Sequence, residues 1–215
     1  MAPTSGQQYM KGLYVITDCA RLPTDPLLSI TEQVLRAGIT ALQYRDKSAD
    51  PVKRTREALA LHTLCRDYDC LFIINDDVQL ARDTGSDGVH LGQGDCSCKA
   101  AREALGTGAI IGVSCYNSLA RAQAAAQQGA DYIAFGSFYP TSSKHNTARA
   151  ETGIIEQAKA GLSLPVAVIG GITPANCTTL LKHGADLLAV ISSVYQAEDP
   201  YSTVKKFNQI IGVAK

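Results

Sequence analysis

The hydrophobic positions of this chain fall into two patterns that alternate along its length. Short apolar runs, such as LYVITD (13–18), LFIIND (71–76) and YIAFGSF (132–138), predict buried strands. Stretches with an apolar residue every three or four positions, such as 51–68 and 118–129, predict amphipathic helices that pack on those strands. This alternation is typical of α/β proteins with a parallel sheet.

Eight such strand–helix units follow one another. The expected strands are 13–18, 41–47, 71–76, 88–92, 110–115, 132–138, 165–171 and 187–195, and the expected helices are 29–38, 51–68, 78–85, 98–106, 118–129, 153–161, 176–184 and 203–211. We therefore predict one domain over 1–215, a single (β/α)8 TIM barrel, with 1–12 as an N-terminal extension. An open doubly wound sheet is the alternative, but no GxGxxG follows the first run.

The junctions between units repeat. Six predicted helices end in a glycine where a residue with positive φ is expected, at Gly38, Gly85, Gly106, Gly129, Gly161 and Gly184. Four junctions carry nearly the same phrase, AGIT, TGSDGVH, QGADYIAF and HGADLLAV. The repetition indicates a shared turn between helix and strand, which is a statement about architecture and not about activity.

Composition excludes several classes of protein. The 20 basic and 20 acidic side chains cancel, so no overall charge attracts nucleic acid or an anionic membrane. The first residues lack the apolar core of a signal peptide, and no apolar run approaches the roughly 20 residues of a membrane span. We therefore expect a soluble cytoplasmic protein without nucleic-acid or membrane partners.

The seven cysteines are an odd number and form no CxxC pair, so reduced thiols are expected in place of a disulfide framework. The CSC sequence at 96–98 raises the question of a metal site. Zinc sites usually have longer ligand spacing and two further ligands nearby, so we interpret this sequence as ordinary structure.

The active site of such a barrel lies at the carboxyl ends of its strands, and these ends are polar here. In the second unit, a period of two places Gln43, Arg45 and Lys47 on one face and Tyr44 and Asp46 on the other. An amide, a guanidinium and an ammonium at the mouth suit a multiply charged phosphate ester. The alternative is a solvated strand end with a surface ion pair.

Carboxylates follow the third and fourth strands. Asp76 and Asp95 would lie at neighbouring strand ends and predict a Mg²⁺ site, completed by water and substrate phosphate oxygens. Capping of the helix that begins near Val78 is the alternative role, which we assign to Asp77. We interpret His90 as a buried, hydrogen-bonded histidine and not as a ligand.

Hydroxyl groups and glycines follow the later strands. Ser114 is expected at the rim after the fifth strand, and Thr141, Ser143 and Lys144 are expected on a loop that closes over a phosphorylated substrate. The alternative interpretation of the segment that carries Thr141, Ser143 and Lys144 is an ordinary surface loop. After the seventh and eighth strands, residues that predict a phosphate pocket are Gly170, Gly171, Ile191 and Ser192, although a tight turn would also explain the glycine pair. Two anion sites at one mouth indicate two phosphorylated substrates.

These motifs together resemble one family. QYRDK (43–47), NDD (75–77), HLGQGD (90–95), GVS (112–114), GADYIAFGSFYPTSSK (129–144), VAVIGGIT (166–173) and AVISSVY (189–195) resemble the thiamine phosphate synthases, in order and with similar spacing from about Leu13 to Tyr195. The resemblance implies a transferase that joins a pyrimidine methyl diphosphate to a thiazole phosphate, or its carboxylated form, and releases pyrophosphate with the help of Mg²⁺.

The resemblance also implies residue roles. Gln43 would contact the pyrimidine, Asp76 and Asp95 would bind Mg²⁺, and Thr141 and Ser143 match a TxT pair in which Ser replaces the second Thr. The implied substrate-binding set is Gln43, Tyr44, Arg45, Asp46, Lys47, Asn75, Ser114, Thr141, Ser142, Ser143, Lys144, Gly171, Ile191 and Ser192. Within it, the implied catalytic residues are Arg45, Lys47, Ser114 and Lys144.

Two alternatives stay open at this point. A thiazole tautomerase shares the barrel and the thiazole phosphate pocket, but it needs neither the diphosphate-binding cations nor both acidic metal ligands. A non-catalytic sensor of phosphate ligands would leave those groups idle. The sequence also leaves homo-oligomerisation open.

Overall fold

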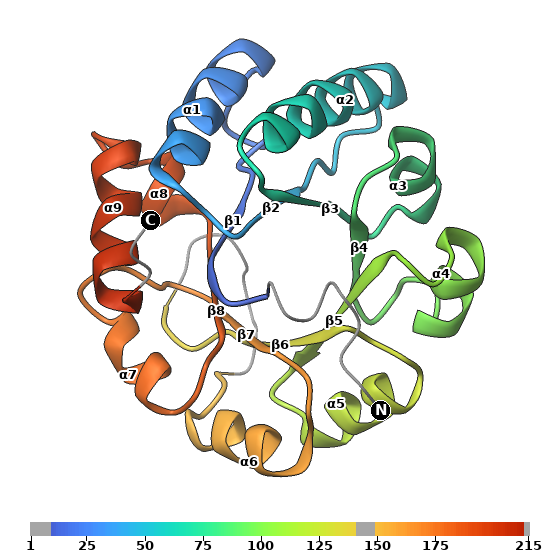
Figure 1. The fold of residues 1–215 in the computed structure, drawn as a ribbon, viewed down its shortest axis with the longest axis vertical. Coiled ribbons are helices and arrows are strands. Elements are labelled where there is room, and N and C mark those ends of the chain that lie inside the picture. Colours follow the sequence, from blue (N-terminus) through green and yellow to red (C-terminus); the bar gives the residue numbers. More distant parts are fainter. Residues whose placement is uncertain (1–9, 141–148, 213–215) are drawn as a thin grey trace.

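The computed structural model describes residues 10–140 and 149–212, and within them eight parallel strands form a closed barrel in sequence order. Figure 1 shows the strands as an inner ring with the helices outside it. The strands are β1 (Gly12–Ile16), β2 (Ala41–Tyr44), β3 (Leu71–Asn75), β4 (Gly88–Leu91), β5 (Ile110–Tyr116), β6 (Tyr132–Gly136), β7 (Val166–Ile169) and β8 (Leu187–Val190). The helices are α1 (Thr24–Ala37), α2 (Pro51–Asp67), α3 (Val78–Thr84), α4 (Cys98–Leu105), α5 (Leu119–Gln127), α6 (Gly153–Gly161), α7 (Cys177–Lys182), α8 (Ser192–Tyr195) and α9 (Pro200–Ile211).

The predicted barrel is thus confirmed, with three corrections of detail. The eighth strand ends at Val190, and the residues after Ile191 form the short helix α8 in place of continued strand. Helix α1 begins at Thr24, five residues before its predicted start. Gly161 is the last residue of α6 and has no positive φ, whereas the other five predicted glycines do.

The strands are buried on both faces, which explains their continuous apolar runs. Alternate side chains of β1 separate into two clusters: Tyr14 and Ile16 pack inside the ring, while Leu13 and Val15 pack against the helices. The interior is filled by side chains such as Ile73, and it is closed because β1 pairs with β8 as well as with β2.

The repeated turn phrase has a common structure. Asp87, Asp131 and Asp186 each precede an even-numbered strand, and each carboxylate accepts a hydrogen bond from a backbone N–H at the start of the preceding strand. These bonds are 2.7 to 2.8 Å long. We call them the three aspartate turns. At the fourth junction Thr40 donates through its hydroxyl to the Lys11 carbonyl oxygen at 2.8 Å.

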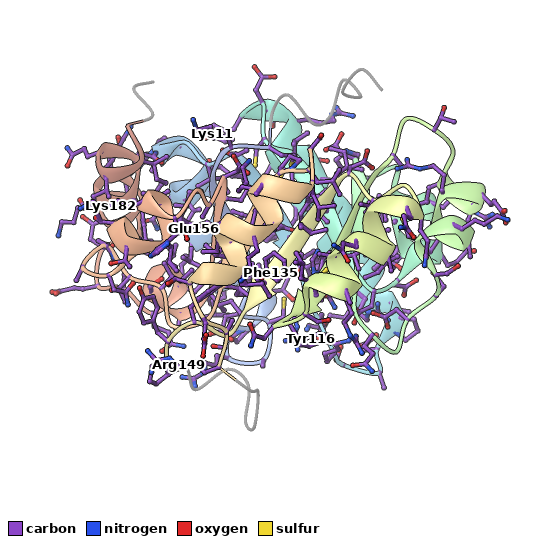
Figure 2. The ribbon with its side chains drawn as sticks, turned by 90° about the horizontal axis from the view of Figure 1, so that it is seen from below. Lys11, Tyr116, Phe135, Arg149, Glu156 and Lys182 are labelled. Carbon is purple, nitrogen blue, oxygen red and sulfur yellow. The ribbon has the colours of Figure 1, made fainter. Side chains whose placement is uncertain are left out.

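The aspartate turns and the predicted site lie at opposite ends of the barrel. In Figure 2, Lys11, which precedes β1, lies at one end, and Tyr116, the last residue of β5, lies with Arg149 at the other. The carboxyl ends of the strands therefore form a mouth that is separate from the turns that begin them.

Two further expectations concern the chain as a whole. All seven cysteines are free thiols. None of the helices in the described part of the chain is both long enough and apolar enough to cross a membrane.

Candidate active site

A cavity of about 110 Å³ opens at the mouth of the barrel, and residues from all eight strands or the segments after them line it. Polar groups are gathered on the side of β2 to β5, where Gln43, Arg45, Asn75 and Ser114 line the wall. Glycines and hydroxyl groups occupy the side of β7 and β8. The cavity therefore has two chemically different ends.

The second strand divides its residues between two environments. Gln43 and Arg45 line the cavity, as the period of two predicts. Lys47, which lies beyond the end of β2, does not line it and pairs with Asp76. Tyr44 is buried on the helix side, where its hydroxyl donates to Glu57 at 2.8 Å, and Asp46 accepts from Lys53 at 2.8 Å. The implied substrate contact of Tyr44 and Asp46 is therefore not seen, because neither lines the cavity; both instead fix the segment that carries the cations.

Asp76 has a positive φ of 64°, and its carboxylate forms an ion pair with Lys47. Its backbone N–H donates to the His90 carbonyl oxygen at 2.8 Å, which ties the end of β3 to β4. Asp95 accepts from the Gly92 N–H at 2.6 Å. Burial alone would raise the pKa of Asp76, but hydrogen bonds with Lys47 and Asp95 lower it, whereas burial and the bond to Asp76 raise the pKa of Asp95.

Two neighbouring carboxyl groups are a suitable ligand pair for a divalent cation. Among residues 10–140 and 149–212, no three His, Cys, Asp or Glu side chains gather as a ligand set. Mg²⁺ is compatible with a pair, because it usually keeps several water or phosphate ligands beside one or two carboxylates. The pair fits Mg²⁺ and not a closed structural zinc site.

Asp77 caps α3, as predicted. Its Oδ1 accepts from the Leu80 N–H at 2.9 Å, and its Oδ2 accepts from Arg54 at 2.8 Å. The cap leaves Asp76 to face Lys47 and Asp95.

The opposite end of the cavity is built from backbone. Gly170 and Gly171 have φ of 109° and 62°, and a Cβ at Gly171 would collide with the Pro140 carbonyl oxygen and the Tyr139 side chain. Ile191 and Ser192 line the same end, as predicted. The close approach of backbone that the glycines permit suits an anion.

Ser193, which was not predicted, also lines this end of the cavity. Its buried Oγ has no hydrogen-bond partner within the described residues. The signal was present in the sequence as the second serine of ISS, which has the same strand parity as Leu187 and Ala189 on the inner face.

Two side chains at the floor of the cavity were also missed. Tyr14 lines it, and His90 lines it while contacting Ser114 Oγ through Nε2 and the Tyr132 hydroxyl through Nδ1, both at 2.9 Å. The interpretation of His90 as a buried, hydrogen-bonded residue is confirmed. Strand parity would have found both, because each lies an even number of residues from an inward-facing position. The predicted loop residues Thr141, Ser142, Ser143 and Lys144 lie outside the described residues.

Comparison with known proteins agrees with this geometry. Residues 13–194 match the family model described as thiamine monophosphate synthase. The chain is 50% identical to thiamine-phosphate synthase of Azoarcus sp. (strain BH72) over 89% of this chain and 92% of that one. It is 48% identical to the enzyme of the same name from Xanthomonas campestris pv. campestris (strain 8004) over 93% and 95%.

A solved structure extends the agreement to three dimensions. Thiamine phosphate pyrophosphorylase from Pyrococcus furiosus matches with a TM-score of 0.86 and 34% identity over 96% of this chain and 97% of that one. The similarity covers nearly the whole length of both chains. The chain therefore belongs to the thiamine monophosphate synthase family of transferases.

Proposed function

We propose that the protein joins a pyrimidine methyl diphosphate to a thiazole phosphate, giving thiamine phosphate and pyrophosphate. The observation that carries the proposal is the two-ended cavity, which offers cationic and carboxylate groups at one end and a backbone anion pocket at the other. A tautomerase would need only the second end.

The end formed by β2 and β3 suits the diphosphate. Arg45 and Asn75 line the cavity, and Lys47 lies beside Asp76. An arginine and a lysine stabilise the charge that grows on a leaving diphosphate, and Asn75 adds an amide donor. By resemblance we assign Lys144 to the same group and place Thr141, Ser142 and Ser143 beside the second substrate.

The thiazole phosphate suits the end formed by β7 and β8. Gly171 and Ser192 present backbone close to the cavity, and the Ser193 hydroxyl has no competing partner in the described structure. A phosphate held there fixes the thiazole ring above the interior of the barrel, so that its nitrogen faces the pyrimidine methylene.

The reaction requires one bond to break and one to form. The bond from the methylene carbon to the diphosphate oxygen breaks with its electron pair on oxygen, and the lone pair of the thiazole nitrogen forms the new carbon–nitrogen bond. The aminopyrimidine can stabilise a methylene cation, so dissociation can precede attack. Gln43 holds that ring, and the protein contributes position and electrostatic stabilisation without a covalent nucleophile.

Asp76 and Asp95 would hold a Mg²⁺ ion, and Lys47, which pairs with Asp76, adds a positive charge beside it. When bound, the ion neutralises charge on the diphosphate oxygens. The residues of this chain have the complementary task of keeping the two carboxylates adjacent, which the Asp76–His90 backbone bond and the Asp95–Gly92 bond achieve.

The test is to mix the full-length protein with both substrates and Mg²⁺ and to follow thiamine phosphate and pyrophosphate, with a chelator control. We expect equal amounts of both products and loss of both on chelation. Binding of thiazole phosphate without product would contradict the proposal and favour a tautomerase or a sensor.

A further inference from the structure

Five polar side chains form a continuous chain of hydrogen bonds beneath the cavity. Gln43 Nε2 donates to the Tyr14 hydroxyl at 2.6 Å, and the hydroxyl oxygens of Tyr14 and Tyr132 lie 2.8 Å apart. The Tyr132 hydroxyl lies 2.9 Å from His90 Nδ1, and His90 Nε2 lies 2.9 Å from Ser114 Oγ. We call this the floor chain. Its two ends, Gln43 and Ser114, both line the cavity.

The interior of the floor chain is closed to solvent. Tyr14 and Tyr132 are fully buried, and Gln43 and His90 are buried as well. Burial raises the pKa of both tyrosines far above the ordinary value, so each keeps its proton. A buried hydroxyl that cannot reach water must donate that proton to a neighbour, because an unsatisfied donor is costly.

The contacts fix the direction of donation. Tyr14 accepts from Gln43, and within the described residues its remaining partner is the Tyr132 oxygen, to which it donates. The Tyr132 proton then goes to His90 Nδ1. A ring nitrogen that accepts carries no proton, so the proton of a neutral His90 lies on Nε2 and is donated to Ser114 Oγ.

We propose that the floor chain holds His90 as the neutral tautomer protonated at Nε2, and that Ser114 therefore directs its own hydroxyl proton to the bound substrate. His90 and Tyr132 are positioning residues in this scheme, and Ser114 is the group that touches substrate.

The directed chain matches the chemistry at its ends, an argument that rests on the proposed function. A diphosphate has only acceptors for hydrogen bonds at neutral pH. Ser114 can therefore bind it by donating its hydroxyl proton, but not by accepting a hydrogen bond from it. At the other end, one Gln43 N–H is committed to Tyr14, which turns the amide oxygen towards a donor such as the amino group of an aminopyrimidine. Reversal of the chain would leave Ser114 in need of a donor beside a diphosphate that has none.

The tautomer can be measured without turnover. The full-length protein labelled with ¹⁵N in its four histidines would be studied without substrate at neutral pH by correlation of ring protons and nitrogens, with His90→Gln identifying the His90 signals. We expect a neutral ring with its proton on Nε2. A proton on Nδ1, or on both nitrogens, would overturn the proposal whatever the protein catalyses.

Removal of one hydroxyl tests the link between tautomer and rate. Tyr132→Phe deletes the donor to His90, and the matched control Tyr195→Phe deletes another buried hydroxyl, which lies on α8 at 2.7 Å from Thr31 of α1. We expect Tyr132→Phe to give a mixture of His90 tautomers and to lower kcat about fivefold to tenfold. Tyr195→Phe should leave the tautomer and kcat unchanged.

If His90 keeps the same tautomer in Tyr132→Phe, the proposed direction of the floor chain is contradicted. Equal losses of kcat in Tyr132→Phe and Tyr195→Phe would contradict it as well. Rescue gives a second readout: His90→Leu should lower kcat more than it changes either KM, and His90→Gln, whose amide can donate near the position of Nε2, should restore most of the loss. An unchanged kcat in His90→Leu would contradict the positioning role of His90. If the proposed coupling itself fails, the ring measurement still decides the tautomer.

Discussion

Asp76 and Asp77 are adjacent residues of the same type that serve different purposes. Asp77 is extended, with φ of −91°, and caps α3, while Asp76 has a positive φ and turns its carboxylate towards Lys47. A positive φ is uncommon outside glycine and costs on the order of 1 kcal/mol or more. The strain places one of the two carboxylates at the cavity mouth and leaves the other at the helix.

This difference gives a matched pair of variants. Asp95→Asn removes a charged oxygen from the carboxyl pair, and we expect the Mg²⁺ concentration for half-maximal turnover to rise roughly tenfold to a hundredfold. Asp77→Asn keeps a good helix cap, because Asn caps as well as Asp, and should leave the Mg²⁺ dependence unchanged. A titration of turnover against Mg²⁺ measures both, and equal shifts would contradict the assignment of Asp76 and Asp95.

Cys115 follows the cavity-lining residue Ser114 on β5. It is fully buried, and burial raises its pKa to about 12, so it remains a thiol at neutral pH and cannot act as a thiolate nucleophile. We expect Cys115→Ala to retain kcat within about twofold, with a stability loss of about 1 kcal/mol. An inactive Cys115→Ala protein that folds and binds both substrates would argue for a covalent role.

At the residue scale, sequence alone could place side chains that follow strand parity. Gln43 and Arg45 were found this way. His90 and Tyr14 follow the same parity, but each has apolar neighbours in the sequence. Their role at the cavity becomes apparent only when their hydrogen-bond partners on other strands are known. The floor chain joins residues as far as 118 positions apart, and one sequence does not show such contacts.

At the element scale, the segments after β7 and β8 decide how the second substrate is held. Both leave strand geometry at once, through the two glycines after β7 and through Ile191, with φ of −124° and ψ of −86°, after β8. The apolar pattern continues through Val194 and Tyr195 because α8 packs on the core. Periodicity therefore could not distinguish a final strand from a strand followed by one helical turn.

The start of α1 has a similar explanation. The predicted helix begins at Ser29, but the helix of the structure includes Pro26 in its first turn, where a missing N–H has no consequence. Three helices with a side-chain cap, α2, α3 and α4, begin directly after Asp50, Asp77 and Ser97, as predicted. Helix α9 also has a side-chain cap, at Asp199, but it begins three residues before its predicted start. A capping residue is therefore a useful but incomplete local signal of where a helix begins.

A second matched pair tests the glycine turn. Gly171→Ala and Gly85→Ala impose the same strain, since their φ values are 62° and 64°, but a methyl group at Gly85 meets open space. Gly85→Ala should lose about 1 kcal/mol of folding free energy, and Gly171→Ala should lose more, because its methyl group also meets the Pro140 carbonyl oxygen and Tyr139. Only Gly171→Ala should raise the KM for thiazole phosphate, by at least roughly tenfold, because the phosphate loses close contact with backbone. An unchanged KM, from steady-state kinetics, would remove Gly171 from the phosphate pocket.

At the scale of the whole molecule, the prediction of one domain is open to a direct test. A ring in which β1 pairs with β8 has no edge at which part of the sheet could separate. We expect a single urea transition with the same midpoint by far-UV circular dichroism and by tyrosine fluorescence, which the nine tyrosines and absence of tryptophan make convenient. Two separated midpoints would divide the chain into independent units.

The aspartate turns should affect stability without affecting catalysis. Asp131 is buried, accepts from the Ile111 N–H at 2.8 Å and pairs with Arg102 at 2.5 Å. Asp131→Ala leaves a donor and a charge without their partner, and we expect it to lower the free energy of unfolding by about 3 kcal/mol. Urea midpoints give the stability, and kcat/KM for both substrates should match the parent protein.

The exposed Asp83, which within the described residues accepts only from Gln79 of its own helix, supplies the control, because Asp83→Ala should change neither quantity. A fall in kcat/KM for Asp131→Ala under conditions where it is fully folded would show that the two ends of the barrel are coupled.

The placement of the aspartate turns opposite the mouth also bears on how such a protein can change over generations. The residues that help to close the ring lie at one rim, and the residues that line the substrate cavity lie at the other. Mutations in the loops at the mouth can therefore change substrate specificity while the ring stays closed. A protein organised in this way can acquire a different chemistry without first having to become a different fold.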